Sequence, residues 1–276
     1  MLLLVFIFQF GLVVGSFLNV IIVRLPGRQS VVFPSSRCPR CSAPIAAYDN
    51  IPVVSFLVLR GRCRQCRQPI PLHYPTVELL TGVVLAGAFW KFGLSPGWAL
   101  NSLFFSGLIA LIFIDLHHRI LPDALTLPIA LAGVCLSYFQ DSSILKPSPL
   151  TAWLDVGMPW GRLAAPMAES LLGAFLGAGI LWLVGFIYYR LRKIEGLGAG
   201  DIKLMLAIGA FLGWTLAWLT IFLGSFLGAV VGSCYMLHKR KDFRYELPFG
   251  SFLGVAAIAS TFWGRTLIDW YGSLYG

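Results

Sequence analysis

The chain has 276 residues, of which 58% are hydrophobic and only 12% are charged. Soluble domains carry about 25% charged residues, so this composition excludes an ordinary soluble domain and, with repeated apolar runs of the ~20 residues that span a bilayer, predicts a polytopic membrane protein. The net charge of +9 could indicate a nucleic-acid partner, but eight arginines gather in one loop, which is typical of a cytoplasmic loop in a membrane protein. We therefore expect no nucleic-acid partner and an all-α fold of about eight transmembrane helices in a lipid bilayer.

The first apolar run predicts a membrane helix over Leu3–Val23. It lacks the basic start and the small-residue cleavage site of a signal peptide, so we interpret residues 1–23 as the first transmembrane segment. Gly15 and Ser16 place small side chains where two helices can pack closely. Asn19 puts an amide near the basic end of this helix, and we expect it to have a buried partner.

A polar segment over residues 24–73 carries the arginines together with two C-x-x-C pairs. The cysteines of these pairs are Cys38, Cys41, Cys63 and Cys66. Their spacing is typical of a tetrahedral site with four thiolate ligands for Zn²⁺. Two disulfides are the alternative, which a reducing cytoplasm disfavours. Four cysteines leave no open position for water, so we expect a structural zinc that folds a small cytoplasmic loop domain.

Two acidic residues near this loop have open roles. Asp49 lies in a turn-forming insert, where it could be a functional acid or could cap the turn. Glu78 lies near the start of the second predicted helix, Tyr74–Phe92. There it could be functional, or it could complement the positive helix N-terminus.

Six further helices are predicted beyond residue 92. They cover Trp98–Ile114, Ala124–Phe139, Ala168–Tyr189, 201–213, 214–237 and Pro248–Trp270. The stretch 201–237 is too long for one crossing, so we expect a break near Gly213. Cys135 and Cys234 lie alone in apolar runs and are interpreted as packing residues.

Charge predicts how these helices are oriented. Residues 140–166 lack a positive bias, so we expect an outer loop there with an interfacial turn around Trp153–Trp160. With the arginine-rich loop inside, eight crossings place residues 115–123, 190–200 and 238–247 on the cytoplasmic side, each with basic residues. Asp115 and Asp201 then lie at the same depth, near the cytoplasmic face.

These two aspartates are the candidate catalytic residues. Asp115 ends one apolar run, and Asp201 begins another directly after Gly198 and Gly200. Two carboxylates a few ångströms apart share a proton and titrate as a unit. The ionised member can activate water while the protonated member polarises a peptide carbonyl.

Each of these polar residues also has a structural alternative. Asp201 could be an N-cap, whereas capping does not explain Asp115, because a negative charge opposes the dipole at a helix C-terminus. Lys203 could tune the charge of the pair or merely lie at the membrane interface. His117 and His118 could bind a metal, but adjacent histidines in a basic loop more often form an exposed face.

Taken together, the motifs resemble those of the bacterial type IV prepilin peptidases, a family of GxGD aspartic proteases. The segments that carry the resemblance are Gly15–Val20 with Arg24–Pro26, Cys38–Cys41, Tyr48–Pro52, Arg60–Cys66, Tyr74–Leu80, Asp115 with Leu121–Asp123, and Gly198–Leu204. They follow the family's order over most of the chain. Where the family often has a second acid two residues after the first catalytic one, this chain has His117.

The resemblance implies a bifunctional, multi-pass enzyme of the bacterial inner membrane with its active site facing the cytoplasm. Such enzymes cleave the leader from type IV prepilins and type II secretion pseudopilins, then N-methylate the new N-terminus with S-adenosylmethionine. It implies that Asp115 and Asp201 are the protease aspartates, with Gly198, Gly200 and Lys203 in support, and that the four cysteines bind zinc. Residues 24–73 would be associated with the methyltransferase and residues 74–276 would form the peptidase domain, with the cofactor-binding residues unassigned.

Two other classes of function stay open at this point. A transporter could use the two aspartates to relay protons, although the chain has no evident internal repeat and such a function gives no reason for the cysteine loop. A zinc-dependent scaffold would carry out no chemistry at all.

Overall fold

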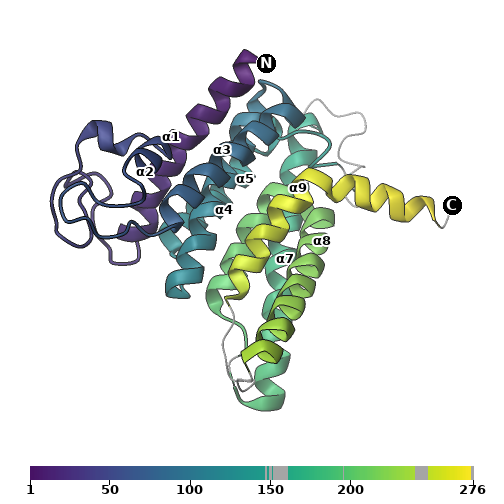
Figure 1. Cartoon of the computed structure of the whole chain (residues 1–276). Helices are drawn as coiled ribbons and strands as arrows, with labels where there is room; N and C mark the ends of the chain where they lie inside the picture. The colour runs from purple at the N-terminus through teal and green to yellow at the C-terminus, as the bar shows by residue number, and fades with distance from the viewer. Residues whose placement is uncertain (147, 149–150, 152–160, 195, 240–247, 275–276) are drawn as a thin grey trace. The chain divides into compact units, whose positions relative to one another are not determined.

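The fold is all-helical in the residues that the computed structural model describes, which are 1–146, 148, 151, 161–194, 196–239 and 248–274. The helices in chain order (Figure 1) are α1 (Leu2–Arg24), α2 (Val54–Val58), α3 (His73–Phe92), α4 (Pro96–His118), α5 (Asp123–Cys135), α7 (Gly161–Arg192), α8 (Ala199–Lys239) and α9 (Phe249–Ser273). Short 3₁₀ turns lie at Ala47–Asn50 and Ser137–Phe139. The prediction of an all-α fold is confirmed.

Five of these helices are long and apolar enough to cross a membrane, namely α1, α4, α7, α8 and α9. With 41 residues, α8 would be about 60 Å long if straight, about twice the thickness of the bilayer core. Its helical geometry is interrupted at Gly213, which has φ 70° and ψ 175°. The break expected near Gly213 is therefore present, while the count of eight crossings stays a prediction.

Some predicted boundaries differ from the structure. The helix expected over Ala124–Phe139 ends at Cys135 and gives way to a 3₁₀ turn. The helix expected from Ala168 already begins at Gly161, with Pro166 inside it, because a membrane helix tolerates proline where other groups satisfy the freed backbone. The interfacial turn expected around Trp153–Trp160 and most of the basic loop 238–247 lie outside the described residues.

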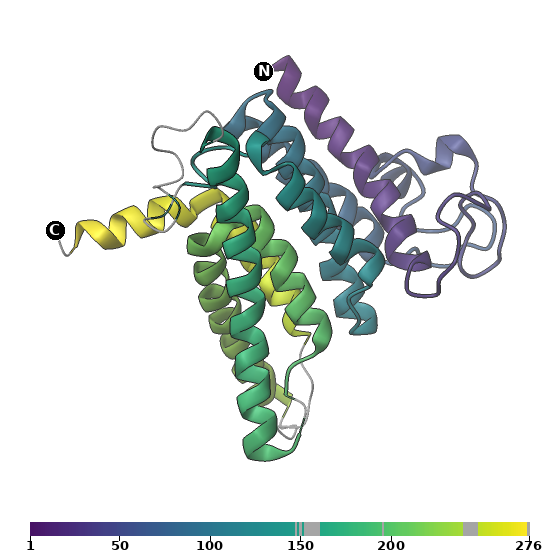
Figure 2. The same ribbon diagram turned by 180° about the vertical axis from the view of Figure 1, so that it is seen from behind.

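The chain divides into two compact units, Met1–Ile114 and Asp115–Gly276. In the second unit α8 runs alongside both α7 and α9 (Figures 1 and 2). Helices α7 and α8 come close because Gly173 of α7 faces Gly209 of α8, and a Cβ on either glycine would collide with the backbone of the other. Small residues at a helix contact are typical of membrane proteins.

In the first unit, α1 and α3 lie side by side along glycine-rich faces (Figures 1 and 2). A Cβ on Gly11 would lie 2.7 Å from the Cα of Gly82, and one on Gly15 would lie 2.6 Å from the Cα of Glu78. The close packing predicted at Gly15 is therefore confirmed. It brings the polar end of α1 against the start of α3.

We expect Gly15→Ala to lower the thermal midpoint of the purified protein in detergent. The added methyl group would meet α3 backbone, which cannot rotate away, and overpacking of this kind costs about 1–3 kcal/mol. Gly27→Ala is the matched control, because its Cβ would have only ordinary contacts at 3.7 Å. Equal thermal midpoints for the two variants would contradict this account of the α1–α3 contact.

Candidate active site and metal centre

Asp115 lies in the last turn of α4 and is the first residue of the second unit. It is only 5% exposed. Its Oδ2 atom accepts hydrogen bonds from the backbone N–H of Ser251 at 2.7 Å and from the Ser251 hydroxyl at 2.9 Å. Charge-assisted bonds such as these are among the stronger hydrogen bonds in proteins, so Ser251 fixes the orientation of the carboxylate.

Asp201 is the third residue of α8, and its carboxylate accepts hydrogen bonds from the backbone N–H groups of Gly198 and Gly250. The N-cap position belongs to Gly198, so the N-cap alternative for Asp201 is wrong. An acidic side chain at the third position that bonds back to the N-cap N–H forms one half of a capping box. Local helix geometry therefore helps to hold Asp201 in place.

The two carboxylates converge beside Gly250, the second residue of α9. A Cβ on Gly250 would lie 3.1 Å from Oδ2 of Asp115 and 3.1 Å from Oδ1 of Asp201. These two oxygens are therefore at most about 6 Å apart. At that separation the ionisation of one carboxylate disfavours that of the other.

The other motif residues support this arrangement from the side. A Cβ on Gly200 would lie 3.1 Å from the Cβ of Leu121, so a glycine lets the start of α8 approach the segment that precedes α5. Lys203 Nζ donates to both carboxylate oxygens of Asp123, at 2.7 and 2.8 Å. This pair joins α8 to α5 at the surface and, being exposed, contributes only about 0–1 kcal/mol.

The paired histidines lie at the surface. His117 and His118 are both exposed, in agreement with the exposed-face alternative. Gly250 and Ser251 were not singled out from the sequence. A glycine and a serine at the start of a helix are common, and no local pattern indicates that they face Asp115.

We expect Gly250→Ala to slow the reaction of the aspartate pair by about 10–100-fold, because a shift of about 1 Å at a catalytic group can cost 10²-fold. The new methyl group would lie 2.8 Å from Leu121 Cδ1 and 3.1 Å from each carboxylate. Gly272→Ala, in the last turns of the same helix, has open space around its Cβ and serves as the control. Initial rates of substrate cleavage test this, and equal rates in the two variants would contradict it.

The four cysteines of the first unit form one cluster. Their sulfur atoms all lie within 4.8 Å of one another, and the Sγ atoms of Cys38 and Cys66 are 3.9 Å apart. Tetrahedral zinc with Zn–S bonds of ~2.3 Å needs sulfurs about 3.8 Å apart, so the cluster fits such an ion. All six cysteines of the chain are free thiols, so the alternative of two disulfides is wrong.

The two cysteine pairs lie in turns of the same geometry. In the first, Cys38 N–H donates to Ala43 O and Ser42 N–H donates to Cys38 O. In the second, the equivalent bonds run from Cys63 N–H to Gln68 O and from Arg67 N–H to Cys63 O. Each turn thus presents two sulfurs on one side, as a four-thiolate site requires.

The protonation of the thiols is uneven. Burial disfavours the Cys38 thiolate, but hydrogen bonds from the backbone of Cys41 and Arg40 hold its pKa at about 7. The backbone of Gln68 favours the Cys66 thiolate, yet desolvation and the neighbouring thiols raise its pKa to about 11. A metal ion must therefore displace a proton from Cys66, as is usual for thiolate sites.

Asp49 anchors the insert between the two turns. Its carboxylate accepts hydrogen bonds from Nε and Nη2 of Arg64, both at 2.7 Å. The Arg64 guanidinium lowers the pKa of Asp49 below its usual value. Asp49 is therefore an ion-pair partner that ties the insert to the second cysteine turn rather than a turn cap, and a role as a functional acid stays a prediction.

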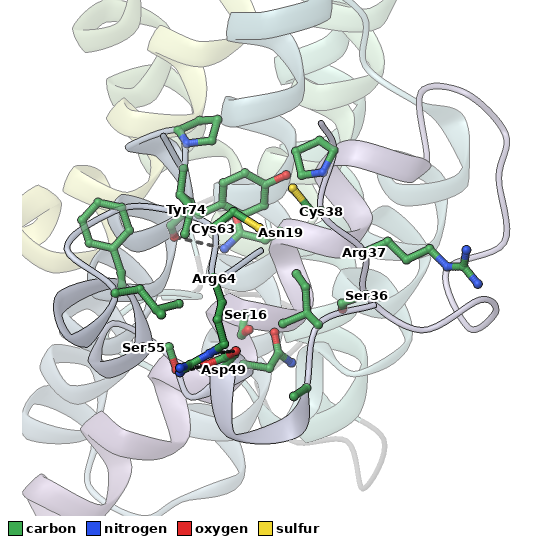
Figure 3. A pocket seen from close by; sticks show the side chains of 18 of the residues that line it. Ser16, Asn19, Ser36, Arg37, Cys38, Asp49, Ser55, Cys63, Arg64 and Tyr74 are labelled. Carbon is green, nitrogen blue, oxygen red and sulfur yellow. Dashed lines mark hydrogen bonds and ion pairs between the residues drawn. The ribbon is translucent and has the colours of Figure 1, made fainter. Parts of the chain in front are cut away.

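A pocket of about 280 Å³ lies between this loop, the end of α1 and the start of α3 (Figure 3). Its wall includes Asn19, Cys38, Tyr74 and Glu78. Asn19 Nδ2 donates to the backbone oxygen of Tyr74 at 3.0 Å, so the expectation that this amide has a buried partner is confirmed. Glu78 Oε2 accepts from Val53 N–H at 2.7 Å.

Comparison with known proteins gives matches along most of the chain. Residues 9–92 match the model of the bacterial Peptidase A24 N-terminal domain, and residues 102–233 match that of the type IV leader peptidase family. A protein of Burkholderia pseudomallei (strain 1026b) named prepilin leader peptidase/N-methyltransferase is 36% identical over 95% of this chain and 85% of its own length. Proteins of the same name from Aeromonas salmonicida (strain A449) and Legionella pneumophila are 34% and 35% identical, over 96% and 95% of this chain and 92% of each relative. No solved structure is significantly similar to the chain.

Proposed function

The chain belongs to the type IV leader peptidase family, and from this premise we propose that it cleaves the leader peptide from prepilins and type II secretion pseudopilins and then N-methylates the new N-terminus. Relatives that are similar over nearly the whole chain carry both activities in their name. The observation that carries the peptidase half is the convergence of Asp115 and Asp201 beside Gly250.

In the proposed reaction the two carboxylates share one proton. The ionised carboxylate removes a proton from a water molecule, which attacks the scissile carbonyl carbon, while the protonated carboxyl donates a hydrogen bond to the carbonyl oxygen. The tetrahedral intermediate then collapses as the leaving amine takes up a proton. Ser251 keeps Asp115 aimed at the reacting atoms through its two hydrogen bonds.

The proposed topology has eight crossings in the bacterial inner membrane. The non-helical geometry at Gly213 supports two crossings within α8. The proposal adds α3 and α5 to the other four long apolar helices. Arg190 and Arg192 lie in the last turn of α7 and Lys193 follows it, shortly before Asp201, which supports a cytoplasmic location for the aspartate pair.

The proposed cofactors are a structural zinc ion and S-adenosylmethionine. The fit of the four sulfurs to tetrahedral Zn²⁺ supports the first, with Cys38, Cys41, Cys63 and Cys66 as its ligands. S-adenosylmethionine supplies the methyl group when bound. The comparisons give no support to a proton-coupled transporter or to a scaffold without chemistry.

The direct test is to incubate the purified enzyme with a full-length prepilin, with and without S-adenosylmethionine, and to weigh the products by mass spectrometry. We expect loss of the leader under both conditions and one added methyl group only with the methyl donor. An intact prepilin after prolonged incubation with the folded enzyme would contradict the proposal.

A further inference from the structure

The pocket of the first unit contains a buried carboxylate that the peptidase reaction does not use. Glu78 is 8% exposed, and it accepts hydrogen bonds from Val53 N–H and from the side chains of Ser16 and Asn19. It is the sixth residue of α3, whereas the helix dipole acts mainly within the first turn. Complementing the helix N-terminus therefore does not explain Glu78.

Asn19 supplies a second acceptor on the same wall. Its Nδ2 is fixed by the bond to Tyr74 O, so the amide orientation is determined. Its Oδ1 is buried and has no hydrogen-bond partner among the described residues, and Asn19 as a whole is only 4% exposed. Leaving such a buried acceptor unsatisfied is unfavourable, so the pocket presents a carboxylate and an amide oxygen that can both accept a hydrogen bond from a bound group.

The basic residues of the same wall are largely engaged elsewhere. Arg64 is paired with Asp49, and Arg24 donates to the backbone oxygens of Ser30 and Ser35. Arg37 and Arg40 are exposed. The positive charge of the loop therefore does not neutralise Glu78 inside the pocket.

We propose that Glu78 and Asn19 bind a primary ammonium group, which is the N-terminus that leader cleavage has just released, and that this pocket is where it is methylated. This inference rests on the proposed function. An ammonium carries one positive charge and three N–H donors, which match one carboxylate and one free amide oxygen. The methyl donor also carries a primary ammonium on its methionine part, and a comparison of free-amine with N-acetylated peptides separates the two ammonium groups.

The chemistry balances with the groups at hand. The ammonium gives one proton to the Glu78 carboxylate, which leaves a neutral amine. The amine lone pair then forms a bond to the methyl carbon as the carbon–sulfur bond of S-adenosylmethionine breaks, with its electrons going to sulfur. The products are a secondary ammonium and S-adenosylhomocysteine, and the proton passes from Glu78 to solvent.

The test compares Glu78→Gln with Asp123→Asn in the full-length enzyme. Glutamine keeps the size and an acceptor for Val53 N–H but loses the charge, so we expect methylation of a short peptide with a free N-terminus to fall by roughly 10²–10⁴-fold, as for loss of a general base. Leader cleavage and zinc content should stay at wild-type values. Asp123→Asn removes an exposed carboxylate that lies outside the pocket, and we expect it to change methylation far less than Glu78→Gln does.

A competition measurement separates failure of this inference from failure of the proposed function. In a Ser16→Cys protein, the free-amine peptide should protect the introduced thiol from modification better than its N-acetylated copy does. Adding Glu78→Gln to this protein should abolish that difference. Methylation by Glu78→Gln within twofold of wild type would overturn the inference. Equal protection by the two peptides in the Ser16→Cys protein that keeps Glu78 would also overturn it. If the wild-type enzyme transfers no methyl group, the protection result alone still decides whether the pocket binds an amine.

Discussion

Replacing either Asp115 or Asp201 by asparagine is expected to reduce leader cleavage by roughly 10²–10⁴-fold or more, the range attributed to a general acid or base. Asparagine keeps the shape of the side chain but cannot take up or release a proton. The two oxygens lie within about 6 Å of each other beside Gly250, so both are needed to activate water and polarise the carbonyl. Initial rates of prepilin processing by purified variants measure the effect.

Asp123→Asn is the matched control for both variants. Asp123 lies between the two aspartates in the chain, is exposed, and is paired with Lys203, so its loss should leave cleavage close to wild type. Methylation of an already cleaved peptide should survive in all three variants. Normal processing by Asp115→Asn or by Asp201→Asn would show that the pair is not the catalytic centre.

Loss of the metal centre is expected to unfold the loop between α1 and α3 and to abolish methylation. Residues 25–72 contain only two short helical elements, Ala47–Asn50 and α2, joined by hydrogen-bonded turns, and structural zinc can contribute about 10 kcal/mol or more to the folding of such segments. Cys38→Ser should lose zinc, lower the thermal midpoint and become sensitive to limited proteolysis in the loop. Metal analysis, thermal unfolding and peptide mapping measure the three effects.

Cys135→Ser provides the control for this variant, because Cys135 is exposed at the end of α5 and belongs to no cluster. It should keep wild-type zinc content and methylation. A Cys38→Ser protein that retains one zinc ion per chain, or that methylates normally without zinc, would contradict a structural metal at this cluster.

The parts of the site that could be predicted are those that depend on the spacing of residues close together in the sequence. Two C-x-x-C pairs predict a four-sulfur cluster wherever the turns meet, and the sulfurs do lie within 4.8 Å. The length of the apolar stretch after Asp201 required a break, and Gly213 is the residue that accommodates one. Charge bias and an expected helix count predicted a common depth for Asp115 and Asp201, whereas their close approach beside Gly250 comes from the structure.

The parts that could not be predicted depend on contacts between distant segments. Ser251 bonds Asp115 from 136 residues away, and its surroundings in the sequence are those of any helix start. The pairing of Asn19 with the start of α3 depends on the close approach at Gly15, which spacing alone does not give. The end of α5 at Cys135 also lies within an apolar run that carries no stop signal.

The central claim is that two acids far apart in the chain face each other, and short-range thiol crosslinking tests it most directly. In a protein carrying Asp115→Cys and Asp201→Cys, a bifunctional thiol reagent with a spacer of ~5 Å, about the Cβ–Cβ distance of two neighbouring side chains, should join the two cysteines. Peptide mapping would reveal the crosslink. The same reagent should not join Asp115→Cys to Asp269→Cys near the far end of α9. Failure of the 115–201 pair to crosslink, while both thiols react singly with a monofunctional reagent, would contradict the account.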